Sequence, residues 1–147
     1  MSLLEKINRD MKQAMMAREE ARLSTLRFLK SAIQYAGLER SAVMSDAQVL
    51  QVIQKQIKQH RESIQQFAGA GRKELVAKEE NEARILESYL PKQISDDELK
   101  KIIGESVREQ GAAGKKDFGR LMKHLSEKLA GSADNKRLSE ILGQLLK

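Results

Sequence analysis

One proline divides a chain that otherwise follows a helical pattern. It lies in the segment Tyr89-Leu90-Pro91, and the apolar residues on both sides of it recur at the three- and four-residue spacing of amphipathic helices. Proline has no amide hydrogen and clashes with the preceding turn, so the incoming helix ends there. Ser95 and Glu98 then have the spacing of a capping box, which starts a new helix. We therefore predict two all-helical domains, residues 1–90 and 91–147.

Four helices are predicted before the proline, joined by short connections that favour an antiparallel four-helix bundle. Ser2 with Glu5 forms a capping box for the first helix, and Ser45 or Asp46 caps the third. The second helix is expected to fade near Gly37, and a loop is expected from Ser41 to Asp46. The apolar positions of the four helices run over residues 4–15, 23–33, 49–67 and 75–90.

Three shorter helices are predicted after the proline, and they make a small three-helix domain. Gly111 ends the first helix, Gly131 ends the second, and Asp134 caps the third. Their apolar positions run over residues 99–107, 118–129 and 138–146. The fold class is therefore all-α.

The composition excludes several kinds of site. The 147 residues include no cysteine, so disulfides, thiolate catalysis and cysteine-based zinc sites are excluded. Two histidines, His60 and His124, are too few for a histidine-based metal site. The acids Asp96, Asp97 and Glu98 occupy a first helical turn, where they interact favourably with the helix dipole without a metal. We predict no metal and no cofactor.

The compartment predicted from the sequence is the cytoplasm. No apolar run approaches the roughly 20 residues that span a bilayer, so no membrane partner is expected. Residues 1–18 lack the apolar core of a signal peptide, and Glu5 and Asp10 are unlike the acid-poor presequences of mitochondrial proteins.

The strongest functional signal is a concentration of basic residues in the second domain. The net charge of the chain is +6. Gly111 and Gly114 form a loop before a helix that begins near Asp117, and a helix N-terminus with free amides favours a phosphate group. The basic surface is either a nucleic-acid contact or an ordinary solvated face. The residues assigned to it are Lys115, Lys116, Arg120, Lys123, Lys128, Lys136 and Arg137.

A second basic row lies on the third helix. Lys55, Lys58 and Arg61 point away from the apolar stripe of that helix, and no acidic residue occurs between Asp46 and Glu62. Contact with an RNA backbone is one interpretation of this row, and a soluble helix face is the other.

Several charged or polar residues lie on apolar helix faces, where they need partners. Lys30 and Glu79 project between apolar residues of the second and fourth helices. We predict a structural network between helices, formed by Arg27, Lys30, Glu79 and Glu82. His60 lies on the apolar stripe of the third helix, and we interpret it as a partly buried histidine bonded to a neighbour.

Nothing in the sequence pairs a nucleophile with a base. The segment GAGRKE follows a helix rather than a strand and lacks the spacing of a nucleotide-binding loop. We therefore assign no catalytic residue, and the sequence argues against an autonomous enzyme.

Five strings make the chain resemble the GatB/YqeY family, in particular its stand-alone YqeY-like members. The resemblance covers almost the full length, and YLPKQIS after a Glu-rich helix is its most specific part. The strings are DMKQAM (10–15), RLSTLRFLKSAI (22–33), IKQHRESIQQFAGAGRKELVAKEENEARILESYLPKQIS (57–95), GKKDFGRLMKHL (114–125) and KLAGSADNKRL (128–138).

The resemblance implies a connection to tRNA. In the glutamine-dependent aminoacyl-tRNA amidotransferase, the B subunit ends in a helical domain and a small tail domain that engages tRNA. YqeY-like proteins correspond to those two parts without the large catalytic domain. Members of the family are described as carbon–nitrogen ligases with glutamine as amide donor, and that description applies to the whole enzyme.

We therefore expect a non-catalytic module that binds tRNA or another structured RNA and acts with proteins of tRNA metabolism. The alternative is a helical adaptor that binds another protein and no RNA. Aromatic residues make up only 3% of the chain, so single-strand recognition by base stacking is disfavoured. Binding is expected to depend on the RNA backbone and its shape.

Overall fold

The protein is entirely helical in the computed structural model, which describes residues 1–40, 43–111 and 114–146. This confirms the predicted all-α fold class. The chain divides into two compact units, Met1–Leu90 and Pro91–Lys147. Each unit has its own apolar core. None of the described helices is both long and apolar enough to cross a membrane.

The first unit consists of four helices whose beginnings follow from local sequence. Ser2 and Glu5 form the predicted capping box, with each side chain accepting from the other residue's amide at 3.1 Å. Ser45 caps the third helix in the same way, with Gln48 as its partner. The four helices are α1 (Leu3–Met16), α2 (Glu20–Arg40), α3 (Asp46–Gly69) and α4 (Lys73–Glu87).

Two helix ends differ from the prediction. α2 continues through Gly37 to Arg40, and residues 41 and 42 of the predicted loop lie outside the described residues. α4 ends at Glu87, before the proline. The chain continues there in 3-10-type turns, in which the amides of Tyr89 and Leu90 donate to carbonyls three residues earlier. The residue before a proline is pushed out of the helical conformation, which accounts for the early end.

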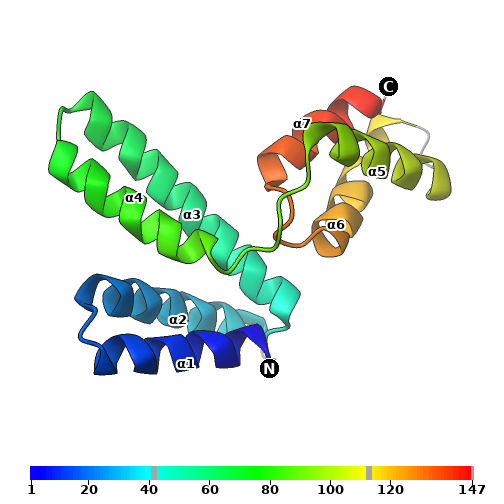
Figure 1. The fold of residues 1–147 in the computed structure, drawn as a ribbon. Coiled ribbons are helices and arrows are strands. Elements are labelled where there is room, and N and C mark those ends of the chain that lie inside the picture. Colours follow the sequence, from blue (N-terminus) through cyan, green and yellow to red (C-terminus); the bar gives the residue numbers. More distant parts are fainter. Residues whose placement is uncertain (41–42, 112–113, 147) are drawn as a thin grey trace. The chain divides into compact units, whose positions relative to one another are not determined.

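The helices of the first unit form two antiparallel hairpins, α1–α2 and α3–α4 (Figure 1). Their shared core is made from α1, α2, the first half of α3 and the end of α4. Its buried residues are Ile7, Leu26, Leu29, Ile33, Val49, Ile53, Ile57, Leu86 and Tyr89.

Beyond this core, α3 and α4 continue as a two-helix arm, residues 58–82, which packs mainly on itself (Figure 1). No side chain of the arm is fully buried. Ile64, Phe67, Leu75 and Val76 are half-buried between the two helices. The arm therefore has less apolar burial to hold it together than the core has.

The second unit contains α5 (Asp96–Glu109), the 3-10 turn η1 (Lys115–Asp117), α6 (Phe118–Lys128) and α7 (Asn135–Leu145). Asp134 caps α7 as predicted, accepting from the Arg137 amide at 2.7 Å. The Ser95 hydroxyl accepts from the Glu98 amide at 3.3 Å. The reciprocal bond from the Glu98 side chain, which a full capping box requires, is not among the contacts of the described residues.

The core of the second unit is built almost entirely from leucine and isoleucine. Its buried residues include Leu99, Ile103, Leu121, Leu125, Leu138 and Leu142. The segment before α5 is tied to the α6–α7 loop by two hydrogen bonds. The Ile94 backbone amide donates to the Ser132 carbonyl at 2.9 Å, and the Gln93 side-chain amide donates to the Gly131 carbonyl at 2.7 Å.

Candidate nucleic-acid interface

Lys115 and Lys116 lie in η1, directly before α6, and both side chains are exposed. In the part of the chain that the structure describes, neither ammonium group forms an ion pair within 4.0 Å. Lys123, on the second turn of α6, is also exposed and has no ion pair there. These three lysines present positive charge to solvent around the first half of α6.

The start of α6 offers fewer free amides than the sequence predicts. The Asp117 amide donates to the Gly114 carbonyl at 3.0 Å, and the Phe118 amide donates to the Lys115 carbonyl. The 3-10 turn therefore uses two of the amides that a helix N-terminus otherwise leaves unpaired. The Asp117 carboxylate adds negative charge at the same place. An anion at this end of α6 would be bound by the lysine side chains rather than by the helix terminus.

Two arginines assigned to the basic surface have partners inside the unit. Arg120 donates to the side-chain oxygen of Gln110 at 3.2 Å and lies 3.3 Å from the Asp117 carboxylate. Arg137 donates to the Asp96 carboxylate at 2.6 Å and to the Ile94 carbonyl at 2.8 Å. Arg120 therefore links α6 to the end of α5, and Arg137 links α7 to the start of α5. Their first role is structural.

The structure divides the remaining lysines into two groups. Lys128 is the last residue of α6, and Lys136 lies in the first turn of α7, so both lie at the far end of α6 from η1. α6 has 11 residues and is therefore about 16 Å long. Lys123 and Lys128 are five residues apart, which places them about 140° apart around the helix. The group around Lys115, Lys116 and Lys123 contains three of these five lysines.

The second basic row is exposed on α3, as the sequence indicates. Arg61 is paired with Glu87 of α4, with 3.2 Å between Arg61 Nη2 and Glu87 Oε1. Lys55 and Lys58 have no ion pair among the described residues. Contact of this row with RNA stays a prediction.

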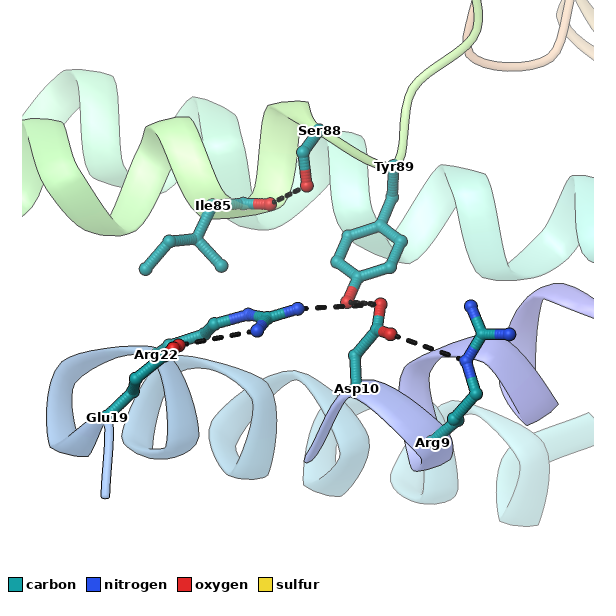
Figure 2. A network of polar contacts seen from close by, with 7 residues as sticks. All are labelled: Arg9, Asp10, Glu19, Arg22, Ile85, Ser88 and Tyr89. Carbon is teal, nitrogen blue, oxygen red and sulfur yellow. Dashed lines mark hydrogen bonds and ion pairs between the residues drawn. The ribbon is translucent and has the colours of Figure 1, made fainter. Parts of the chain in front are cut away.

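Asp10 and Tyr89 form a buried polar pair that sequence reasoning missed (Figure 2). Asp10 is only 7% exposed, and its carboxylate accepts from the Tyr89 hydroxyl at 2.6 Å. Arg22 lies 4.0 Å from the same carboxylate oxygen, and Arg9 lies 3.7 Å from the other. The position of Asp10 in the sequence could have indicated its burial. It lies three residues after Ile7 and four before Ala14, on the buried stripe of α1.

Burial raises the pKa of Tyr89 well above its ordinary value. The hydrogen bond to Asp10 and the negative charge of Asp10 raise that pKa further, and Arg22 opposes them. The native structure therefore holds the phenolic proton more tightly than the unfolded chain does.

Tyr89→Phe removes this ionisable group, and we expect it to change the alkaline limb of the stability profile. The pKa of Tyr89 is about 10 in an unfolded chain and higher in the folded one. Its contribution to stability is therefore complete below about pH 10 and is lost as the pH rises beyond that value. Urea denaturation above pH 10 should show a steeper fall in the free energy of unfolding for the unsubstituted chain than for Tyr89→Phe. Parallel pH profiles would contradict this expectation.

The charge network predicted among Arg27, Lys30, Glu79 and Glu82 is not the arrangement found. The described ion pairs of both glutamates are with His60: its Nδ1 lies 2.5 Å from Glu79 Oε2 and 3.6 Å from Glu82 Oε2. Arg27 and Lys30 form no ion pair with either glutamate among the described residues. The physical reason is that the α2 residues pack into the core of the unit, whereas Glu79 lies in the arm formed by α3 and α4. The interpretation of His60 as a partly buried histidine bonded to a neighbour is confirmed.

A family model described as Yqey-like protein matches residues 4–146 of the chain. The chain belongs to the YqeY-like family. The resemblance identified from the sequence strings is thereby confirmed.

Curated relatives of this YqeY-like protein include fungal proteins named "Altered inheritance of mitochondria protein 41, mitochondrial". The one from Pyrenophora tritici-repentis is 28% identical, over 96% of this chain and 81% of its own length. The one from Vanderwaltozyma polyspora is 27% identical, over 76% of this chain and 64% of its own. The one from Kluyveromyces lactis is 37% identical, over 56% of this chain and 45% of its own.

The names of these YqeY-like relatives place them in mitochondria and state no biochemical activity. The cytoplasmic location predicted from residues 1–18 stays a prediction for this chain.

Proposed function

We propose that this YqeY-like protein is a non-catalytic RNA-binding module whose preferred ligand is tRNA. The observation that carries the proposal is the group of exposed lysines at η1 and the first half of α6, Lys115, Lys116 and Lys123, which have no acidic partner among the described residues. Exposed lysines near a phosphate backbone gain affinity by releasing counterions from the nucleic acid. The resemblance to the tRNA-engaging tail of the amidotransferase B subunit selects tRNA as the ligand to test.

The mode of recognition follows from the residues available. Phe118 is the one aromatic residue in 91–147, and it packs against the apolar core of the unit. This unit therefore offers no exposed Phe, Tyr or Trp ring on which a base could stack. The lysines contact phosphates and carry no information about base identity. We infer that the protein recognises the shape and backbone of a folded RNA and works beside other proteins of tRNA metabolism.

The direct test is titration of labelled bulk tRNA with the full-length chain at low salt, followed by a fluorescence-anisotropy readout. The proposal requires saturable binding, and unlabelled folded tRNA should compete better than single-stranded RNA of equal length. Absence of binding at low salt would remove the proposal. Equal competition by any polyanion would reduce it to nonspecific charge attraction.

A protein-binding adaptor is the second candidate, and one observation favours it. Phe28, Tyr35 and Leu38 are 66–78% exposed on α2, and their positions fall within an arc of about 80° around the helix. A shallow depression of about 420 Å³ lies on the same helix, and its lining includes Leu23 and Phe28. Large exposed apolar side chains on one face are typical of a contact surface.

A double substitution distinguishes the RNA-binding function from the adaptor function. Phe28→Ser with Tyr35→Ser removes the apolar face of α2 and leaves every lysine in place. Under the RNA-binding proposal, the affinity of this variant for tRNA is unchanged. A protein partner that is captured by the unsubstituted chain and not by this variant, in the absence of tRNA binding, would establish the adaptor instead.

A further inference from the structure

His60, Glu79 and Glu82 bring three metal-ligating groups together from two helices. Their ligand atoms, one imidazole nitrogen and two carboxylate oxygens, all lie within 4.8 Å of one another. His60 comes from α3, and the two glutamates lie three residues apart on one face of α4. The antiparallel packing of the arm places the histidine against both.

The three side chains are held in a protected position. Their exposed fractions are 16%, 19% and 21%, so each is mostly covered but still reachable from solvent. Partial burial limits the rotamers of the ligands and lowers the local dielectric. Both effects strengthen the attraction between the carboxylates and a cation. An opening to solvent leaves room for water in the remaining coordination positions.

The charge balance of the cluster favours a cation. Glu79 and Glu82 are like charges on one helix face, which repel each other at this spacing. In the part of the chain that the structure describes, no lysine or arginine pairs with either carboxylate, and their one partner is His60. The imidazole is charged only when it is protonated, and it then balances one carboxylate at most. A divalent cation balances both carboxylates at once.

The distances suit a single ion of the zinc class. Zn²⁺ binds imidazole nitrogen and carboxylate oxygen at about 2.0–2.2 Å, which puts neighbouring ligand atoms roughly 3–3.5 Å apart. His60 Nδ1 lies 2.5 Å from one carboxylate oxygen and 3.6 Å from the other. Binding of the ion would replace the hydrogen bond between His60 Nδ1 and Glu79 Oε2, with side-chain rotations that bring the ligand atoms to that spacing. An imidazole ligand selects zinc and its transition-metal neighbours over Mg²⁺ and Ca²⁺, which prefer oxygen.

We propose that His60, Glu79 and Glu82 bind one divalent transition-metal ion, Zn²⁺ foremost, and that the ion cross-links α3 to α4 in the two-helix arm. The sequence predicted no metal site, because it has only two histidines. Its pattern does not show that a second helix brings two carboxylates to one of them. The position of the cluster indicates that the ion would stabilise the arm. The arm has no fully buried side chain, and the cluster lies just beyond the last buried residue of α3, Ile57.

The experiment is a titration of the metal-free, full-length chain with Zn²⁺ in competition with a chromophoric chelator, paired with thermal unfolding with and without Zn²⁺. We expect one ion per chain, a rise of the melting temperature with Zn²⁺, and no rise with the same concentration of Mg²⁺. His60→Gln, Glu79→Gln and Glu82→Gln are each expected to weaken Zn²⁺ binding at least about tenfold and to remove the thermal shift. His124→Gln, which changes the other histidine, is the matched control and should retain both.

Several outcomes overturn the proposal. The first is that the unsubstituted chain does not bind Zn²⁺. The second is that His60→Gln binds Zn²⁺ with the same affinity as the unsubstituted chain. The third is that His124→Gln loses Zn²⁺ binding. Far-UV circular dichroism identifies a variant that fails to fold. Glu82→Gln then carries the test, because it keeps the shape of the side chain and, with 3.6 Å between Glu82 Oε2 and His60 Nδ1, breaks no direct hydrogen bond to His60.

Discussion

Changing Lys115 and Lys116 together to Glu is expected to weaken tRNA binding at least about tenfold near 0.1 M salt and to reduce the salt slope by about two, one for each phosphate that no longer meets a lysine. The two ammonium groups are exposed and unpaired among the described residues, so the substitution breaks no ion pair there and leaves the core untouched. Stability should therefore stay close to that of the unsubstituted chain. Fluorescence anisotropy with labelled tRNA measures the fall in affinity.

The same unit offers a matched control for this variant. Lys100 and Lys101 are adjacent exposed lysines on α5, outside the group at η1 and α6. Lys100→Glu with Lys101→Glu changes the net charge by the same amount. Binding is expected to fall much less in this control. An equal fall in both variants would mean that total charge, rather than the surface at η1, determines affinity.

Asp10→Ala is expected to lower the free energy of unfolding by roughly 2–3 kcal/mol, because it removes a charged acceptor and leaves the buried Tyr89 hydroxyl without its partner. The pair joins the first helix to the turn that closes α4, so its removal loosens the packing between residues 79 positions apart in sequence. Urea denaturation measures the change.

A double-mutant cycle with Tyr89→Phe isolates the Asp10–Tyr89 bond from the other effects of each substitution. Glu62→Ala, which removes an exposed acid from α3, is the control and is expected to change stability by less than about 0.5 kcal/mol. Additive effects of Asp10→Ala and Tyr89→Phe would show that the hydrogen bond contributes nothing.

The helices were predictable because their signals are local. Caps at Ser2, Ser45 and Asp134 depend on residues within one turn, and the apolar periodicity needs no knowledge of the fold. The end of α4 was misplaced by about a turn, since the effect of Pro91 extends into the residues before it.

The partners of charged side chains were not predictable, because they depend on which helices pack together and on which residues along those helices face each other. Arg120 and Arg137 looked like ligands for phosphate in the sequence, yet each has an acceptor at one end of α5. Glu79 needed a partner, as the sequence indicated. The partner is His60, since only α3 and α4 extend into the arm.

A salt series is the most stringent test of the proposed lysine–phosphate contacts with tRNA. Affinity of the full-length chain for tRNA is measured at several concentrations between about 50 and 250 mM salt, and the logarithm of the binding constant is plotted against that of the salt concentration. Two to five lysine contacts predict a slope of roughly −1.4 to −4.5. A slope near zero, or no binding at the lowest salt, would show that such contacts do not hold the RNA.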